Sequence, residues 1–134
     1  MIYRLTIRST VREELINITD SIEALLKPTP LPSGYVICFV PHTTAGITIN
    51  ENADPDVRRD LLYKLRADIP VDDPNYRHGE GNSDAHLKAS LMGASAQIIF
   101  EHRRLVLGTW QAVYFCEFDG PRQREVIVRV VPVA

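Results

Sequence analysis

The stretch that most limits the possible folds is residues 96–133, which consists largely of β-type sequence. Runs rich in Val, Ile, Phe and Tyr follow one another there and break at EHRR and FDGPRQ, which are typical of turns. The pattern predicts three or four strands arranged as a meander. A chain with this tail must build at least one sheet.

The N-terminal part of the chain predicts further strands and a short helix. Residues 2–9 alternate apolar and polar side chains and residues 12–18 follow them, so we expect two strands joined as an antiparallel hairpin. Helical spacing begins at residue 20 and ends at KPTPLPSG, because prolines cannot continue a helix. The continuous apolar run 35–40 predicts a strand buried on both faces, and 47–49 predicts another short strand.

Two more helices are predicted in the middle of the chain. The clearer one is ADPDVRRDLLYKLRAD, with Asp54 as its N-cap and an apolar stripe that includes Leu61. SDAHLKASLMG predicts a shorter helix that begins at Ser83 or Asp84 and stops at Gly93 in a left-handed conformation. The fold class that follows is α+β, a largely antiparallel, sandwich-like sheet with about three helices in a single domain of residues 1–134.

The composition and net charge of the chain argue against nucleic acid and membranes as binding partners. The chain is 45% hydrophobic and 24% charged, which fits one domain with a sizeable core. A formal net charge of -2 gives no overall attraction to nucleic acid or to anionic lipid. No apolar run approaches the length that crosses a bilayer, so we expect a cytoplasmic protein with no membrane partner. Cys38 and Cys116 lie in apolar runs and are predicted to be core residues.

Two groups of polar residues are unusual for positions so close to strands and helices. Each member taken alone is explained as a turn or cap residue. Together, imidazoles, carboxylates and glycines directly before a helix N-terminus predict a site for an anion and a metal. The first group is His42, Thr43, Thr44, Asn50, Glu51, Asn52 and Asp54, and the second is His78, Glu80, Asn82, Asp84, His86 and Lys88.

The chemistry of these groups suits a phosphate or diphosphate. Unpaired N–H groups at the helix starts near Asp54 and Asp84 attract anions, and an exposed Lys88 adds a full positive charge. The spacing His-x-Glu-x5-His matches no closed zinc pattern, so metal binding depends on His42, His78 and His86 coming together in space.

The only tryptophan, Trp110, has two interpretations. It is either a large core anchor or an aromatic face of a pocket for a flat ligand. In the second interpretation Gln111 and Glu117 supply polar contacts to the ligand.

Three separate segments resemble the YjbQ family, also called the secondary thiamine-phosphate synthases. They are HTTAGITINENADPDVRRDL, HGEGNSDAHLKASLMG and RLVLGTWQAVYFCEF, in the order of the family and at about its spacing. The resemblance implies a compact α+β sandwich, a homotrimer and a pocket built from the histidine-bearing segments. The implied reaction joins hydroxymethylpyrimidine diphosphate to thiazole phosphate and releases diphosphate.

The resemblance also implies roles for particular residues. Catalytic roles fall to His42, Glu80, His86 and Lys88; substrate binding to Thr44, Asn50, Glu51, Asp54, Asn82, Trp110 and Gln111; and ligation of a divalent ion, Mg or Zn, to His42, His78 and His86. Two alternatives remain open. One is a non-catalytic trimer that binds a metal or a phosphorylated ligand, and the other is a metal-dependent hydrolase with Glu80 as general base.

Overall fold

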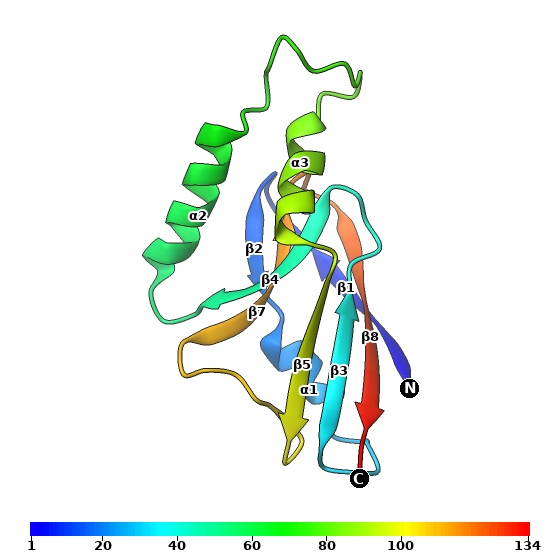
Figure 1. The fold of residues 1–134 in the computed structure, drawn as a ribbon. Coiled ribbons are helices and arrows are strands. Elements are labelled where there is room, and N and C mark those ends of the chain that lie inside the picture. Colours follow the sequence, from blue (N-terminus) through cyan, green and yellow to red (C-terminus); the bar gives the residue numbers. More distant parts are fainter.

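The computed structural model describes residues 1–134 as two antiparallel sheets and three helices (Figure 1). The larger sheet has the strand order β1-β8-β3-β5-β6 and the smaller has β2-β7-β4. The predicted α+β class is confirmed. The strands are β1 (Ile2–Arg8), β2 (Glu14–Asn17), β3 (Gly34–Phe39), β4 (Ala45–Glu51), β5 (Ser95–Glu101), β6 (Arg104–Leu105), β7 (Gln111–Glu117) and β8 (Gln123–Pro132), and the helices are α1 (Thr19–Ala24), α2 (Pro55–Asp68) and α3 (Ser83–Met92).

The two sheets pack face to face around the main core. Apolar side chains from alternate positions of β3, β8 and β7 meet there, because each strand directs every second residue to the same face. Cys38 lies in this core and Cys116 in a second apolar cluster beneath the helices, and burial raises the pKa of each thiol to about 12. Both cysteines are therefore core residues, as predicted.

The expected strand pairing is wrong in two places. β1 and β2 do not form a hairpin, because β1 pairs with β8 and β2 pairs with β7. The tail is not a meander either, since β7 belongs to the smaller sheet and β8 lies between β1 and β3 in the larger one. Between β1 and β2, and again between β7 and β8, the chain passes from one sheet to the other. Successive strands therefore bury their apolar faces against each other across the sandwich.

β3 is buried on one face only, which corrects the expectation of two buried faces. Val36 and Cys38 lie in the core, whereas Tyr35 and Phe39 are exposed on the outer face of the larger sheet. Ile99 on the neighbouring strand β5 pairs with Tyr35 and is also exposed. The outer face of this sheet therefore carries an apolar surface.

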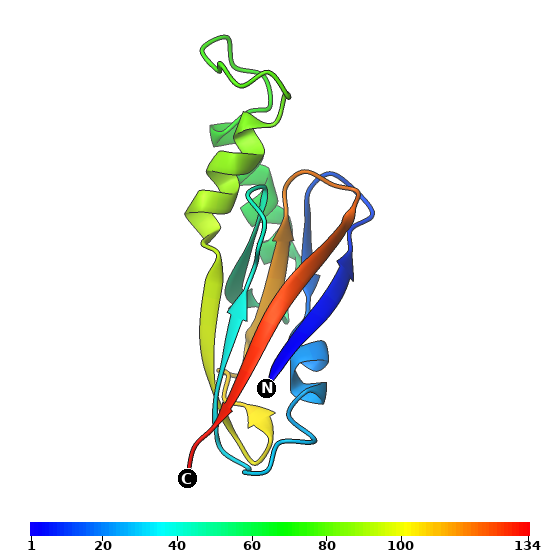
Figure 2. The same cartoon turned by 90° about the vertical axis from the view of Figure 1, so that its right-hand side faces the viewer.

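α2 and α3 cover the outer face of the smaller sheet and are joined by a loop that projects beyond them (Figures 1 and 2). α2 begins as predicted, with the Asp54 carboxylate accepting a hydrogen bond from the Asp56 amide. Its apolar stripe, including Leu61, is only partly buried. None of the three helices is both long enough and apolar enough to cross a lipid bilayer.

α3 lies close to β4 because Gly46 has no side chain. A Cβ atom at Gly46 would lie 2.8 Å from the carbonyl oxygen of Gly93 and 3.0 Å from Cβ of Met92. α3 stops at Gly93, as predicted, with a positive φ of 93°, but the ψ of 162° differs from the expected left-handed conformation; at the other end Asn82 rather than Ser83 or Asp84 occupies the N-cap position. This contact fixes the C-terminal end of α3 beside the start of β4.

Candidate functional site

A cavity of about 470 Å³ lies where α3 begins, and no hydrophobic side chain lines it. Three segments meet there: the connection from β3 to β4, the residues before and within α3, and the turn from β7 to β8. The lining residues are Pro41, His42, Thr43, Thr44, His78, Glu80, Asn82, His86, Asp119, Arg122 and Arg124.

Three histidines from two distant parts of the sequence line this cavity together. His42 comes from the connection between β3 and β4, His78 from the projecting loop and His86 from the first turns of α3. The His78 and His86 rings meet edge to face, with their centroids 5.3 Å apart. Thr44, Glu80 and Asn82 from the predicted set line the same space.

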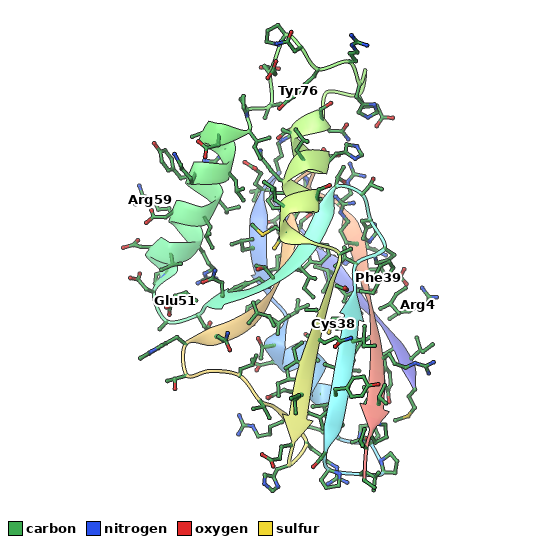
Figure 3. The ribbon with its side chains drawn as sticks, in the orientation of Figure 1. Arg4, Cys38, Phe39, Glu51, Arg59 and Tyr76 are labelled. Carbon is green, nitrogen blue, oxygen red and sulfur yellow. The ribbon has the colours of Figure 1, made fainter.

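The other predicted residues lie at the opposite end of β4. Asn50 and Glu51 end the strand, Asp54 starts α2, and Gln111 pairs with Glu51 across the sheet. The seven residues of β4 span roughly 20 Å, so the strand separates the two halves of the first polar group. Figure 3 shows Glu51 below the start of α2, whereas Tyr76 lies in the loop beyond the other end of that helix.

Trp110 belongs to this distant set and is 62% exposed. It is therefore not a core anchor. Its backbone carbonyl accepts a hydrogen bond from the Asn52 amide, which ties the loop before β7 to the end of β4. Trp110 and Gln111 do not line the histidine cavity.

Arg124 forms one wall of the cavity and is held by a buried carboxylate. Its Nε and Nη2 donate to both carboxylate oxygens of Glu117, and Nη2 also donates to the hydroxyl of Thr44. Ser9 donates to Glu117 at 2.7 Å, and the Asp119 amide donates to it at 3.0 Å. Every lone-pair direction of the carboxylate is thus engaged, which fixes the guanidinium as a rigid donor.

These contacts set the charge of the pair. Burial, the largest influence, raises the pKa of Glu117, but hydrogen bonds from Arg124, Ser9 and the Asp119 amide outweigh it, so the pKa is lowered from 4.5. Glu117 is therefore ionised at neutral pH. The expected role of Glu117 as a polar contact beside Trp110 is wrong, because its side chain is fully buried under Arg124.

A second chain of ion pairs holds α3 against the turn from β7 to β8. Arg12 donates to Asp84 at 3.1 Å and lies 3.6 Å from Asp119. Asp119 in turn accepts from Arg122 at 3.0 Å and from the side-chain amide of Asn82 at 2.8 Å. These contacts hold the start of α3, with Asn82, next to the turn that carries Asp119 and Arg122, so the two segments line the same cavity.

Lys88 is not exposed, which corrects the expectation that it faces a diphosphate. Its side chain is 0% exposed, and its ammonium donates to Asp84 at 2.8 Å and to Glu13 at 2.9 Å. Lys88 lies on the face of α3 that packs on the sheet, and it is absent from the lining of the cavity. Its charge is neutralised inside the protein and stabilises the fold.

The positive charge available at the cavity comes instead from Arg122 and Arg124, which sequence reasoning missed. Two signals point to them in retrospect. Glu117 is a charged residue in the otherwise apolar run AVYFCEF, and a buried carboxylate needs a cationic partner. Arg122 and Arg124 follow a turn at alternate positions, which places both on the same side of the chain.

His42 is held in one tautomer. Its Nε2 accepts a hydrogen bond of 3.0 Å from the Glu125 amide, so its proton resides on Nδ1. Burial and the nearby charge of Arg124 lower the pKa of His42 from 6.5. His42 is therefore a neutral ring at neutral pH, with one N–H donor.

The three histidines predicted to bind a metal line the same cavity, but they are not grouped as metal ligands in this structure. Nowhere in residues 1–134 are three or more His, Cys, Asp or Glu side chains grouped so that they could hold a metal. One nitrogen of His42 is already used by the Glu125 amide, and its other nitrogen carries the proton. Binding of Mg or Zn by His42, His78 and His86 stays a prediction.

A second cavity, of about 480 Å³, adjoins the first across the His78–His86 pair. It differs from the first in carrying apolar surface, from Tyr76 and Leu87, together with Arg77. The two imidazoles form a wall common to both spaces. The site thus offers a purely polar compartment beside one that suits a ring.

Comparisons with known proteins match nearly the whole chain to one family. The family model described as "UPF0047 protein YjbQ-like" matches residues 3–133. UPF0047 protein YugU of Bacillus subtilis is 50% identical over 131 residues, which cover 98% of this chain and 99% of that protein. UPF0047 protein MJ1081 of Methanocaldococcus jannaschii is 47% identical over 98% of this chain and 94% of its own.

Solved structures show the same fold. The crystal structure of a protein of the yjbq/upf0047 family from Clostridium acetobutylicum superposes with a TM-score of 0.93 at 49% identity, covering 96% of this chain and 99% of that one. A YbjQ-like protein from Sulfolobus solfataricus has a TM-score of 0.91 at 29% identity, covering 99% and 97% of the two chains. The sandwich described above is therefore common to proteins that differ widely in sequence.

Proposed function

Because the chain belongs to the UPF0047 family of YjbQ-like proteins, we propose that it joins hydroxymethylpyrimidine diphosphate to thiazole phosphate in the cavity at the start of α3. The observation that carries the proposal is the pair of guanidinium groups, Arg122 and Arg124, in a cavity without any hydrophobic lining. Such a cavity suits a highly charged anion.

The proposed reaction is an alkyl transfer to nitrogen. The lone pair of the thiazole ring nitrogen forms a bond to the methylene carbon of the pyrimidine, while the bond from that carbon to the diphosphate oxygen breaks. Diphosphate leaves with the electron pair, and the thiazole ring becomes a cation. Groups that stabilise the charge growing on the leaving oxygen lower the barrier.

The chain supplies several donors for that leaving group. Arg124 is fixed through Nε and Nη2 by Glu117 and Thr44, which leaves Nη1 to face a ligand. α3 begins at Ser83 beside the cavity, so its first amide groups and the positive end of its dipole favour an anion. His42 adds the Nδ1 proton of its neutral ring.

Two reactants need two neighbouring binding sites, and the adjoining cavities meet this need. The polar cavity suits the diphosphate, and the cavity with Tyr76, Leu87 and Arg77 suits a ring that bears a phosphate. His78 and His86 lie between them, where the new carbon–nitrogen bond would form. Holding both reactants at this wall gives the proximity that the reaction requires.

The test is product formation from the two phosphorylated precursors with magnesium in the buffer, compared with a reaction lacking protein. We expect wild-type protein to form thiamine phosphate and Arg122→Ala to lower turnover by roughly 10- to 1,000-fold, as for loss of one charge-stabilising donor. Arg122 is half-exposed, so this variant should keep its melting temperature. The matched control is Arg59→Ala, an exposed arginine on α2 (Figure 3).

His86→Ala should also lower turnover, since it removes half of the wall between the two cavities. If wild-type protein forms no product but binds inorganic diphosphate, a non-catalytic phosphate-binding protein replaces the synthase. If it neither forms product nor binds diphosphate, the assignment of this cavity to a phosphorylated ligand is wrong.

A further inference from the structure

Asn82 carries a buried acceptor that the protein itself does not use. The residue is 9% exposed and lines the polar cavity. Its Oδ1 atom is buried and has no hydrogen-bond partner, although buried side-chain oxygens are nearly always paired. An unpaired acceptor in the wall of a cavity indicates a partner that arrives with the ligand.

The orientation of the Asn82 amide follows from its neighbours. Its Nδ2 donates to Oδ2 of Asp119 at 2.8 Å. The same carboxylate oxygen also accepts from Arg122 at 3.0 Å, and the carboxylate lies near Arg12, so its partners are all donors. Turning the amide over would direct Oδ1 at this carboxylate and repel it. The oxygen is therefore the atom left for the ligand.

We infer that Asn82 Oδ1 accepts a hydrogen bond from an N–H or O–H group of the ligand, so that the cavity selects a phosphate ester that also carries such a donor. This inference rests on the proposed function and makes it more specific. In the proposed pyrimidine substrate the donor is the exocyclic amino group on the ring. The phosphate groups of the same molecule contact Arg122 and Arg124.

The selectivity has a physical cause. Oδ1 is already buried without a partner in the free protein, so a ligand that brings the donor gains a hydrogen bond there, whereas a ligand that lacks the donor leaves the acceptor unpaired. Sites of this kind discriminate against analogues without the donor. Arginine contacts alone would bind both ligands equally well, since both carry the phosphate.

Calorimetry with two matched ligands and two forms of the protein tests the inference. The ligands are the aminopyrimidine monophosphate and its analogue with hydrogen in place of the amino group, and the proteins are wild type and Asn82→Ala. We expect wild type to bind the amino ligand about tenfold more tightly. Asn82→Ala should bind both ligands alike, at the affinity of the weaker one. Gln97→Ala, on the outer face of β5, should keep the wild-type preference.

Each result separates the inference from the proposed function. Equal binding of the two ligands to wild type overturns the role of Asn82 and leaves a phosphate site, and this comparison needs no variant. A preference that persists undiminished in Asn82→Ala also overturns it. If wild type binds neither pyrimidine nor inorganic diphosphate, the proposed function fails and the inference fails with it.

Discussion

At the scale of single residues, charged side chains buried by the fold are the main departure from what the sequence predicts. Lys88 and Asp84 are four residues apart on α3 and are both fully buried, while Arg124 lies against Glu117. Removing one member of such a pair leaves the other as an uncompensated charge away from water. Stability and site geometry therefore depend on the same few side chains.

Lys88→Met tests whether Lys88 is structural. We expect the free energy of unfolding to fall by about 3 to 5 kcal/mol, because Asp84 and Glu13 both lose the ammonium that they share inside the protein. Lys64→Met removes a lysine that is 72% exposed and paired with Asp68 on α2, and it should cost less than about 1 kcal/mol. Urea denaturation measures both. Equal costs for the two variants would contradict the buried network.

Glu117 should contribute a pH-dependent part of the stability. Its pKa in the folded protein lies below 4.5, so its contribution is complete above that pH and is lost as the pH falls through the folded value. Glu117→Gln should therefore lose less unfolding free energy than wild type between about pH 7 and about pH 3. Glu101→Gln, at an exposed position, should keep the wild-type dependence. Denaturant titrations at both pH values give the comparison, and identical losses in all three proteins would exclude this role of Glu117.

At the scale of elements, most strands and helices could be predicted from the sequence, whereas their partners could not. Alternation of apolar residues identifies a strand, but it carries no information on which strand lies beside it. The prediction of strands in residues 2–9 and 12–18 is confirmed, but the hairpin between them is wrong. The same limit explains why β7 and β8, neighbours in sequence, lie in different sheets.

For the site, too, the sequence identifies unusual residues but does not show which of them come together in space. The histidines were identifiable because imidazoles and carboxylates near glycines are unusual beside a strand and a helix. Asn50 and Asp54 were grouped with His42 because they are close in sequence, although β4 carries them to its other end. The spacing of Lys88 from Asp84 is that of an ion pair on one helix face, but this spacing does not show whether the pair is buried or exposed.

The close contact between α3 and β4 gives a prediction at this scale. Gly46→Ala should destabilise the protein by about 1 to 3 kcal/mol, since a new methyl group meets the backbone at Gly93 and the helix must move away. Gly79→Ala is the matched control, because a Cβ atom there meets nothing within 4 Å. Thermal denaturation measures the stability of both variants, and only Gly46→Ala should melt at a lower temperature than wild type. A stable Gly46→Ala protein would mean that α3 can shift without cost.

The apolar stripe of α2 should matter less than its sequence suggests. Leu61 is only partly buried, so Leu61→Ala should cost less than the roughly 2 to 5 kcal/mol of a fully buried leucine. The comparison is Val36→Ala in the sandwich core, where the side chain is completely buried. If Leu61→Ala costs the more of the two in urea denaturation, α2 is covered by something outside this chain.

At the scale of the whole molecule, the outer face of the larger sheet bears on the predicted homotrimer. Ile99 is 65% exposed, and Tyr35, which pairs with it, and Phe39, further along β3, are also exposed. A broad apolar surface of this kind favours association with other copies of the chain. We propose that this face takes part in the trimer.

Light scattering tests the assembly. We expect a mass three times that of the 15.1 kDa chain, and a lower mass for Ile99→Arg because a charge on this face opposes association. Tyr63→Arg changes an equally exposed aromatic residue on α2 and should keep the wild-type mass. A single-chain mass for wild type would remove the trimer, and dissociation by Tyr63→Arg alone would place the contact on α2.

The position of β8 determines when the larger sheet can close. Ile2 of β1 pairs with Arg129, and Gly34 of β3 pairs with Pro132, so β8 lies between β1 and β3. Both of these strands precede β8 by about 90 residues or more in the sequence. During synthesis on the ribosome, β1 and β3 therefore emerge without the partner that later joins them. Until residues 123–132 leave the exit tunnel, the nascent chain presents unpaired strand edges that invite aggregation. Chaperones that bind extended apolar segments can bind the nascent chain during that interval. The interval ends only when β8 inserts between β1 and β3.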